Sequence, residues 1–261
     1  MTGGCWPGVF GSGDRVMILS TLLTTLRSTL LTLRVFFKLG IVINVLLHGP
    51  ALAIDHLQDP LRILALGDSL IAGYGLDDLE DAFPARLQVG LRAVGHNTTI
   101  IPGGISGDTT AGGRARLDWM LADYPDAVIV ELGGNDGLRA LNPEVTYNNL
   151  SAILTRLKAD EIPVLLTGML APPNLGKDYG QRFNSIFPKL AIEFDVLFYP
   201  FFLTDVAAVA HLNQDDQIHP NNLGVEVIVR QILPYVEKLI EQVNDKRKKQ
   251  ATSEASGALG P

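Results

Sequence analysis

The stretch that decides the fold runs from Leu61 to Tyr74 and reads LRILALGDSLIAGY. Its first half is a short apolar run, typical of a strand that is buried on both faces. The run ends abruptly at Gly67, and the polar pair Asp68 and Ser69 follows at once. Open parallel sheets carry their chemistry at the carboxyl ends of such strands. The stretch therefore predicts a serine that is presented at the edge of a sheet and not packed into a core.

Composition indicates a packed globular protein. The chain has 261 residues, a hydrophobic content of 47%, 26 glycines and a formal net charge of −7, which is typical of a turn-rich α/β protein. An acidic chain lacks the electrostatic footprint of nucleic-acid binding, so no nucleic-acid partner is expected. The only cysteine, Cys5, lies near the start of the sequence. This position excludes disulfides and thiol catalysis for the rest of the chain.

The first 53 residues are interpreted as an N-terminal leader. Basic residues precede a short apolar run at 40–47, and the segment ends in Ala51-Leu52-Ala53. This order is typical of a secretory signal, and the run is shorter than the roughly 20 residues that a membrane span needs. We expect export, a periplasmic location, cleavage near Ala53 and no membrane span in the mature chain. An uncleaved amphipathic anchor is the alternative.

Beyond the leader, strand patterns alternate with helix patterns. Strands are expected at 61–66, 98–101, 127–132, 163–167 and 196–199, and helices at 82–94, 108–124, 143–158, 181–194 (kinked at Pro188) and 223–243. Such alternation implies a parallel sheet that helices cover on both faces. We expect a three-layer α/β/α sandwich in residues 54–245, with a doubly wound, flavodoxin-like, five-stranded sheet. Residues 246–261 are expected to form a disordered tail.

Four polar clusters follow strand ends or precede a helix, and such ends meet at one edge of a parallel sheet. The clusters contain Ser69, Gly107, Asn135, and the pair Asp216 and His219. A serine hydroxyl needs a base to take its proton, and a histidine oriented by a carboxylate does this near neutral pH. Ser69, His219 and Asp216 can fill these roles. The N–H groups of Ser69 and Gly107 and the side-chain amide of Asn135 can donate to an oxyanion.

Each of these residues has a plainer explanation when it is taken alone. Ser69 can cap a helix, Asn135 can belong to a turn, and Gly107 can be required only for a positive φ angle. The clusters are informative because they occur together. Among the five histidines, only His219 has a carboxylate three residues before it and a helix after it. The chemistry needs no metal and no organic cofactor.

The clusters resemble the motif blocks of the SGNH (GDSL) hydrolase family, in that family's order. G-D-S-L stands at 67–70, the glycine of the second block at 107, G-x-N-D at 133–136 and D-x-x-H-P at 216–220. The resemblance covers about residues 61–239 and implies an SGNH hydrolase domain at 54–245. It also implies a catalytic triad of Ser69, His219 and Asp216. The implied oxyanion hole consists of Ser69, Gly107 and Asn135.

Within the family, the chain looks most similar to the bacterial secreted branch of thioesterase I, lysophospholipase L1 and arylesterase. The similarity rests on residues 131–139, 173–174 and 179–184. It implies hydrolysis of small carboxylic esters or thioesters, such as aryl esters, acyl-CoA or lysophospholipids. Two departures leave the preferred substrate open: extra residues at 175–178, and Gln217 where a glycine is common. Apolar residues at 138–141, 170, 172, 173 and 175 can line an acyl channel or simply pack beneath a loop.

Two other functions stay open. A carbohydrate O-acetyl esterase of the same fold is less favoured, because the sequence has no aromatic-rich platform for sugars. A non-catalytic, flavodoxin-like module that holds an anion at 67–73 is also less favoured. The P-loop pattern of glycine, lysine and serine or threonine is missing, and such a module leaves Asp216 and His219 unexplained. Labelling of Ser69 by a serine-directed phosphonate separates an enzyme from a binder.

Overall fold

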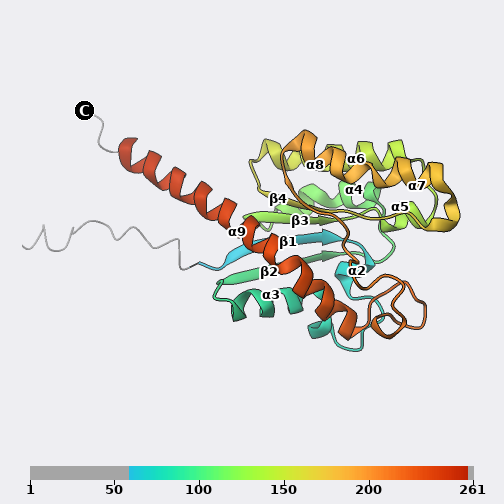
Figure 1. Ribbon diagram of the computed structural model, residues 1–261. Coiled ribbons are helices and arrows are strands. Elements are labelled where there is room, and N and C mark those ends of the chain that lie inside the picture. The colour runs from blue at the N-terminus through green and yellow to red at the C-terminus, as the bar shows by residue number, and fades with distance from the viewer. Residues whose placement is uncertain (1–58, 258–261) are drawn as a thin grey trace, which may run out of the picture. The chain divides into compact units, whose positions relative to one another are not determined.

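The computed structural model describes residues 59–257. Five strands form one sheet: β1 (Leu61–Gly67), β2 (Thr98–Gly104), β3 (Ala127–Glu131), β4 (Val164–Thr167) and β5 (Leu197–Tyr199). All neighbouring strands pair in parallel, in the order β2-β1-β3-β4-β5 (Figure 1). This order is that of the flavodoxin-like doubly wound sheets, so the predicted fold class is confirmed. The predicted leader and its cleavage site lie outside the described residues.

Helices cover both faces of the sheet. Figure 1 shows α3 (Phe83–Ala93) and α9 (Asn222–Gly257) on one face, with α4 (Thr110–Leu121), α6 (Pro143–Ala159) and α8 (Ile186–Phe194) on the other. The shorter elements are α2 (Ser69–Ala72), η1 (Leu79–Asp81), α5 (Gly134–Leu138), η2 (Pro173–Leu175), α7 (Lys177–Asn184) and η3 (Ala210–Leu212). The arrangement is the expected three-layer sandwich.

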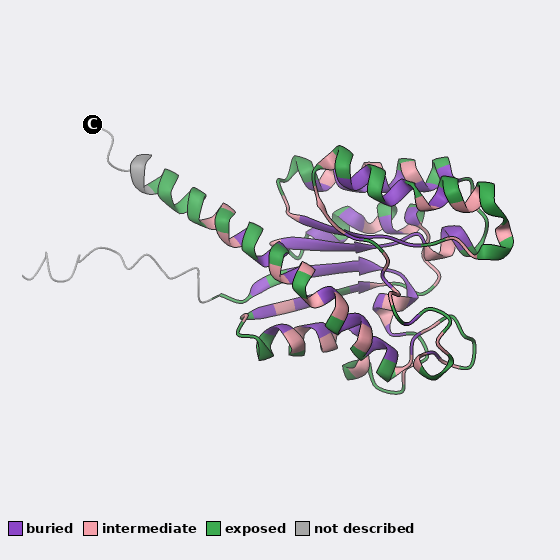
Figure 2. Ribbon diagram, viewed as in Figure 1, coloured by how far each residue is buried: buried purple, intermediate pink, exposed green. Residues whose placement is uncertain are grey.

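The core lies between these layers. Residues 63–66 of β1 and 127–130 of β3 are completely buried, and Figure 2 shows the sheet as the buried centre of the molecule. A strand buried on both faces reads as a continuous apolar run, which is why the two central strands were visible in the sequence. Each fully buried large aliphatic side chain contributes about 1.5–3 kcal/mol relative to exposure. The sheet is therefore a rigid support for the loops at its carboxyl edge.

Three elements differ from the sequence predictions for identifiable reasons. Strand β2 continues past Ile101 to Gly104, although Pro102 lies in it. A proline is tolerated there because β2 is an edge strand, whose outer N–H groups need no partner. The helix predicted at 181–194 is two helices, separated at Ser185. Pro188 has no N–H to donate to the carbonyl of Asn184, so α7 ends at Asn184.

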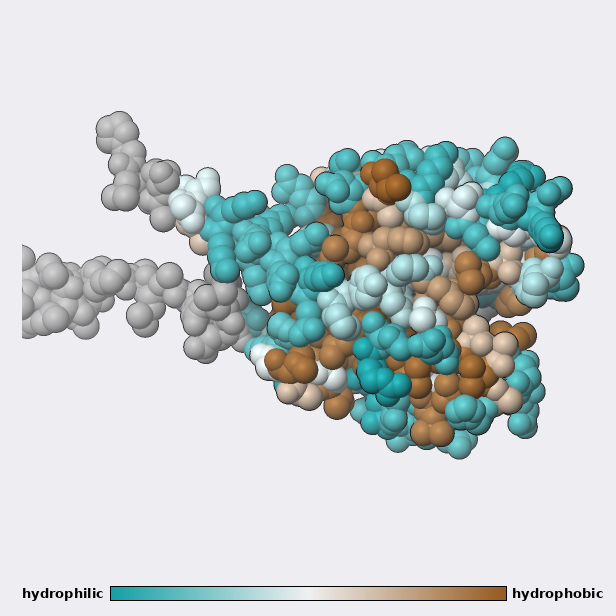
Figure 3. All heavy atoms as spheres, in the orientation of Figure 1, coloured by the Kyte–Doolittle hydropathy of each residue, from teal (hydrophilic) through white to brown (hydrophobic). Residues whose placement is uncertain are grey.

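The last helix is longer than predicted. It was expected to end at Val243 and to lead into a tail, but α9 continues to Gly257. Contacts of two basic residues hold its extension: Lys246 Nζ donates to the carbonyl of Glu161, and Arg247 forms an ion pair with Asp126 at 2.6 Å. Figure 3 shows this part of α9 covered by hydrophilic residues. No helix within residues 59–257 is long and apolar enough to cross a membrane.

Candidate active site

The nucleophile candidate sits where β1 meets α2. A Cβ at Gly67 would lie 2.2 Å from Ile71 Cγ1 and 2.6 Å from Glu131 Oε2, so only glycine lets the chain turn this closely against β3. Asp68 caps the new helix, because its Oδ1 accepts from the Leu70 N–H at 3.0 Å. Ser69 follows as the first residue of α2 and is 9% exposed. The turn holds the serine at the sheet edge, as the sequence predicted.

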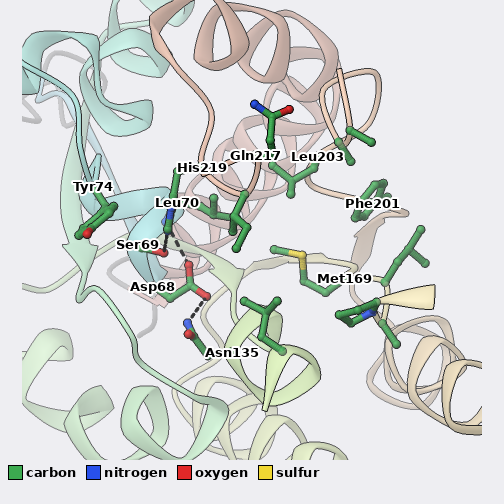
Figure 4. Close-up of a pocket in the computed structure, with 18 of the residues that line it drawn as sticks. Asp68, Ser69, Leu70, Tyr74, Asn135, Met169, Phe201, Leu203, Gln217 and His219 are labelled. Carbon is green, nitrogen blue, oxygen red and sulfur yellow. Dashed lines mark hydrogen bonds between the residues drawn. The ribbon is translucent and has the colours of Figure 1, made fainter. Parts of the chain in front are cut away.

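A chain of hydrogen bonds joins Ser69 to the loop that precedes α9. His219 Nε2 lies 2.9 Å from Ser69 Oγ, and His219 Nδ1 lies 2.5 Å from Asp216 Oδ2 (Figure 4 shows the serine and the histidine). A carboxylate can only accept, so Nδ1 carries the ring proton and Nε2 is left to accept from the Ser69 hydroxyl. The structure thus brings together the three residues predicted as a triad, in the order that activates a serine.

Asp216 is held in its charged form. Partial burial alone raises the pKa of this carboxyl, but the hydrogen bonds that it accepts outweigh that effect. Its donors are the His219 ring and the backbone N–H groups of His219 and Ile218, at 3.0 and 2.9 Å for the two N–H groups. The pKa of Asp216 therefore falls to about 2. The imidazole faces an ionised carboxylate throughout the neutral pH range.

The three predicted oxyanion donors lie around the serine, but they are not equivalent. No hydrogen bond from the backbone N–H of Ser69 or Gly107 occurs within the described chain, so both groups are free to donate. The Asn135 amide is engaged: Nδ2 lies 3.0 Å from Asp68 Oδ2 (Figure 4) and 2.9 Å from the carbonyl oxygen of Asp108. Both partners only accept, so both hydrogens of this amide are already in use.

Two buried carboxyl groups lie beneath the serine. The Asp68 N–H donates to Glu131 Oε2 at 3.3 Å, and Glu131 Oε1 has no hydrogen-bond partner among the described residues. Burial raises the pKa of Asp68 to about 6, against the lowering effect of the Leu70 and Asn135 hydrogen bonds and of His219. Complete burial, with Asp68 beside it, raises the pKa of Glu131 well above its ordinary value. Neither carboxyl was predicted to have a role.

Arginines brace the loop that carries Gly107. Arg116 donates from Nε to Asp108 Oδ2 and from Nη2 to the Gly67 carbonyl, both at 2.7 Å, so it joins the ends of β1 and β2. Arg139 Nη2 donates to the carbonyl oxygen of Gly107 at 2.8 Å. The Gly107 backbone is left-handed, with φ of 84°. These contacts fix the loop and leave the backbone N–H of Gly107 without a hydrogen-bond partner among the described residues.

A cavity of about 820 Å³ opens beside the serine. Most of its lining is apolar and includes Leu70, Leu138, Met169, Leu170, Pro172, Pro173, Phe201, Leu203, Ala207 and Ile218. Residues 138, 170, 172 and 173 were predicted to line an acyl channel, whereas the predicted Leu141 and Leu175 are not in its wall. In Figure 3 hydrophobic residues gather at the lower right, over loops at the edge where the strands end. Within residues 59–257, no cluster of three or more acidic, histidine or cysteine side chains could hold a metal ion.

Comparison with known proteins identifies the family. The model of the GDSL-like Lipase/Acylhydrolase family matches residues 65–227. The chain belongs to this family. It is 42% identical over 160 residues to an arylesterase of Vibrio mimicus, a match that spans 61% of this chain and 80% of that protein. It is 44% identical over 160 residues to the thioesterase 1/protease 1/lysophospholipase L1 of Escherichia coli strain K12, spanning 61% and 75% of the two chains.

A solved structure agrees with these relatives. The crystal structure of AlinE4, described as an SGNH-hydrolase family esterase, is 48% identical, with a TM-score of 0.59 and coverage of 69% of this chain and 96% of that one. The predicted family, fold and enzyme class are therefore confirmed: this GDSL-like chain is an ester hydrolase of the SGNH fold. The domain boundaries and the roles of individual residues are left as predictions.

Sequence reasoning missed the residues that support the site. Glu131 gave a usable signal, because it is an acidic residue inside an otherwise apolar strand, and such a residue is rarely buried without a role. Asp68 gave a weaker signal as the neighbour of the serine. Gln214 gave none, because the serine-hydrolase chemistry assigns no role to a glutamine at this position. Its contact with Tyr74, 140 residues away in the sequence, became visible only in the folded chain.

Proposed function

We propose that this GDSL-like hydrolase cleaves carboxylic esters or thioesters through an acyl-enzyme formed on Ser69. The observation that carries the proposal is the hydrogen-bond chain from Ser69 through His219 to Asp216, which opens on an apolar cavity. The relatives' names suggest aryl esters, thioesters and lysophospholipids as substrate classes. All three present a carbonyl next to an apolar group, which suits this cavity.

The mechanism follows from the geometry. His219 Nε2 takes the hydroxyl proton as Ser69 Oγ attacks the carbonyl carbon, and Asp216 stabilises the resulting imidazolium. The N–H groups of Ser69 and Gly107 donate to the developing oxyanion. Asn135 joins them by sharing a hydrogen that it now donates to Asp68 or Asp108. The imidazolium then protonates the leaving group, and a water molecule, activated by His219 in the same way, releases the acid.

The two competing functions are disfavoured by specific contacts. An anion at the start of α2 would compete with the Asp68 carboxylate, which already caps this helix of four residues. A polysaccharide acetyl esterase needs polar partners for sugar hydroxyls, whereas the cavity wall is mostly apolar. An acyl chain is the better occupant, because each buried methylene contributes about 0.8 kcal/mol.

Hydrolysis of p-nitrophenyl esters with two to sixteen carbons tests the proposal, with Ser69→Ala as the matched variant. We expect Ser69→Ala to abolish turnover and a phosphonate ester to label the wild type but not the variant. Apparent affinity should rise up to about fourfold per added methylene until the cavity is filled. Turnover that survives in a folded Ser69→Ala variant would overturn the assignment of the nucleophile.

We further propose that residues 1–53 are an export leader, that 54–245 are the hydrolase domain, and that the mature enzyme is periplasmic. The basic residues, the short apolar run and the Ala51-Leu52-Ala53 ending support this proposal. Sequencing of the N-terminus after expression in a Gram-negative host checks it. The expected first residue lies near Ile54, in the periplasmic fraction. Full-length protein retained with the cells contradicts cleavage.

A further inference from the structure

Gln214 joins two loops that lie far apart in the sequence. Its side-chain Nε2 donates to the carbonyl oxygen of Tyr74 at 2.7 Å and to that of Pro220 at 3.0 Å. Both hydrogens of the amide are therefore used, one on the segment after Ser69 and one on the residue after His219. The side chains of Ser69, His219 and Asp216 take no part in these two bonds.

The backbone of Gln214 closes the turn that carries the base. Its N–H donates to the His219 carbonyl at 2.8 Å, and its carbonyl oxygen accepts from Gln217 N at 2.9 Å. The segment lies outside the main sheet and has only one isolated bridge, between Asn213 and Pro220. Asn221 adds further bonds, from its N–H to the Leu212 carbonyl at 3.0 Å and from its side-chain Nδ2 to the carbonyls of His211 and Asn213. Gln214 differs from Asn221 because it also reaches the segment that follows Ser69.

The other end of the link reaches the nucleophile. The Tyr74 N–H donates to the Ser69 carbonyl at 3.1 Å, and the Tyr74 carbonyl accepts from Gln214. The Tyr74 ring also packs on the His219 imidazole, with ring centroids 4.6 Å apart. Two hydrogen bonds thus connect the Ser69 backbone to Gln214, which is bonded to the segment that holds His219. The covalent path between the serine and the histidine spans 150 residues.

We propose that Gln214 is a positioning residue that sets the distance between Ser69 Oγ and His219 Nε2. The inference rests on the proposed function, since it assumes that this pair transfers a proton. Proton transfer requires heavy atoms within about 2.6–3.2 Å, and a misplacement of about 1 Å can cost 10²-fold in rate. Without Gln214, the Ser69 and His219 loops are joined through the 2.9 Å bond of the reacting pair itself, with the Tyr74 ring beside it.

The chain offers a matched control for a glutamine that is only structural. Gln88 Oε1 accepts from the Ile100 N–H at 2.9 Å and joins α3 to β2, and its side chain does not line the cavity. Gln88 and Gln214 are both half-buried. Methionine is close to glutamine in size and cannot make these bonds. Gln88→Met removes one hydrogen bond to a backbone group away from the reacting pair, and Gln214→Met removes two hydrogen bonds to backbone groups beside it.

The test measures kcat and KM for p-nitrophenyl butyrate, the rate of Ser69 labelling by a p-nitrophenyl phosphonate, and the melting temperature. We expect Gln214→Met to lower kcat and the labelling rate by about 10- to 100-fold, with KM within about threefold. Gln88→Met should also lower the melting temperature and keep wild-type kcat. Gln214→Glu keeps the size, lacks both donated hydrogens and should show the same loss of kcat; it serves if the methionine variant does not fold.

Wild-type kcat and labelling rate in a folded Gln214 variant would overturn the inference, as would losses that Gln88→Met reproduces. Ser69→Ala, measured alongside, separates this failure from that of the proposed function. If wild-type turnover is missing or does not depend on Ser69, the ester-hydrolase mechanism itself is wrong. If turnover depends on Ser69 but not on Gln214, only the positioning role is wrong.

Discussion

The turn that carries Ser69 and the loop that carries His219 reach the same atoms by different physical means. The turn joins the buried strand β1 to α2, and a missing Cβ at Gly67 lets it close against Glu131. The loop around His219 is largely exposed and lies outside the main sheet, and hydrogen bonds to Gln214 hold it. One half of the site is fixed by packing and the other by polar contacts. Substitutions in the two halves should therefore fail in different ways.

The largest expected effect is in the packed half. Gly67→Ala places a Cβ 2.2 Å from Ile71 Cγ1 and 2.7 Å from the Glu131 carbonyl oxygen. Neither neighbour can move freely, so we expect a loss of about 3 kcal/mol in the free energy of unfolding, the upper end of the usual cost of overpacking, measured by urea denaturation. Gly180→Ala is the control: it lies in α7 with no heavy atom within 4 Å of the added Cβ. The control should gain up to about 1 kcal/mol. Equal stability of the two variants would show that packing does not fix the turn.

The second-largest effect is expected from removing Asn135, one of the three predicted donors to the oxyanion. Loss of one oxyanion donor costs about 10²–10³ in kcat, so Asn135→Ala should fall in this range. Its melting temperature should also fall, because the buried Asp68 carboxylate loses the hydrogen bond from Asn135. The free N–H groups of Ser69 and Gly107 set the alternative outcome. A kcat within tenfold of the wild type would mean that these two donors suffice and that Asn135 mainly serves Asp68 and Asp108.

The pH dependence of stability tests the buried carboxyl beneath the serine. Asp68 has a pKa of about 6 in the folded chain against an ordinary value of 3.8. The folded state thus binds the proton more tightly, and Asp68 lowers stability progressively as the pH rises from about 4 to 6. A pKa difference of about two units corresponds to roughly 3 kcal/mol in the free energy of unfolding. The stability of Asp68→Asn relative to the wild type should therefore rise by up to roughly 3 kcal/mol between pH 4 and pH 7, as thermal denaturation at the two pH values would show.

The same substitution should lower kcat. An asparagine whose oxygen caps Leu70 turns its amide nitrogen toward the Asn135 nitrogen, and two donors then face each other. If the stability difference does not change between pH 4 and pH 7, Asp68 is not the titrating group.

The smallest effect lies in the polar half. Gln217 has a φ of 59°, in the left-handed region, where a side chain costs roughly 1–2 kcal/mol. Gln217→Gly relieves this strain but removes the bond from Nε2 to the Gln214 carbonyl at 3.1 Å, so the free energy of unfolding should change by less than about 1 kcal/mol. Gln217→Val loses the bond and increases the strain, because a β-branched residue is least tolerated in the left-handed region, and it should cost about 1–2 kcal/mol. Equal effects of both variants in urea denaturation would contradict this balance.

The difference between the two halves also explains which parts of the site could be predicted from the sequence. The packed half was predictable, because buried strands and a glycine stop leave a local pattern around Ser69. The residues 107, 135, 216 and 219 were found because each sits beside a strand end or a helix start. Helix α5 was not predicted, since Gly134-Asn135-Asp136-Gly137-Leu138 is five residues long and rich in glycine. Its helical form depends on Asp136, whose carboxylate accepts from Thr110 and Thr146 on neighbouring helices.

The residues that support the site could not be predicted either, because their roles depend on contacts with residues far away in the sequence. The partners of Asp68 are 63 and 67 residues away, at Glu131 and Asn135, and that of Gln214 is 140 residues away. None of these three contacts follows a period of two or of 3.6 residues. The chemistry could be predicted from residue types in order, whereas the contacts that set its geometry could not.

The position of the base after the fifth strand has a consequence for how the enzyme becomes active. All of β1 to β5 is complete by Tyr199, whereas Asp216 and His219 follow and are anchored by α9. A growing chain that has been synthesised as far as β5 therefore contains Ser69 and still lacks its general base. Contacts of such long sequence separation are late and slow to form. In refolding experiments, hydrolysis should return with the slowest phase, after the secondary structure measured by circular dichroism. A chain whose last helix has not yet packed against the sheet is thus expected to be inactive toward esters.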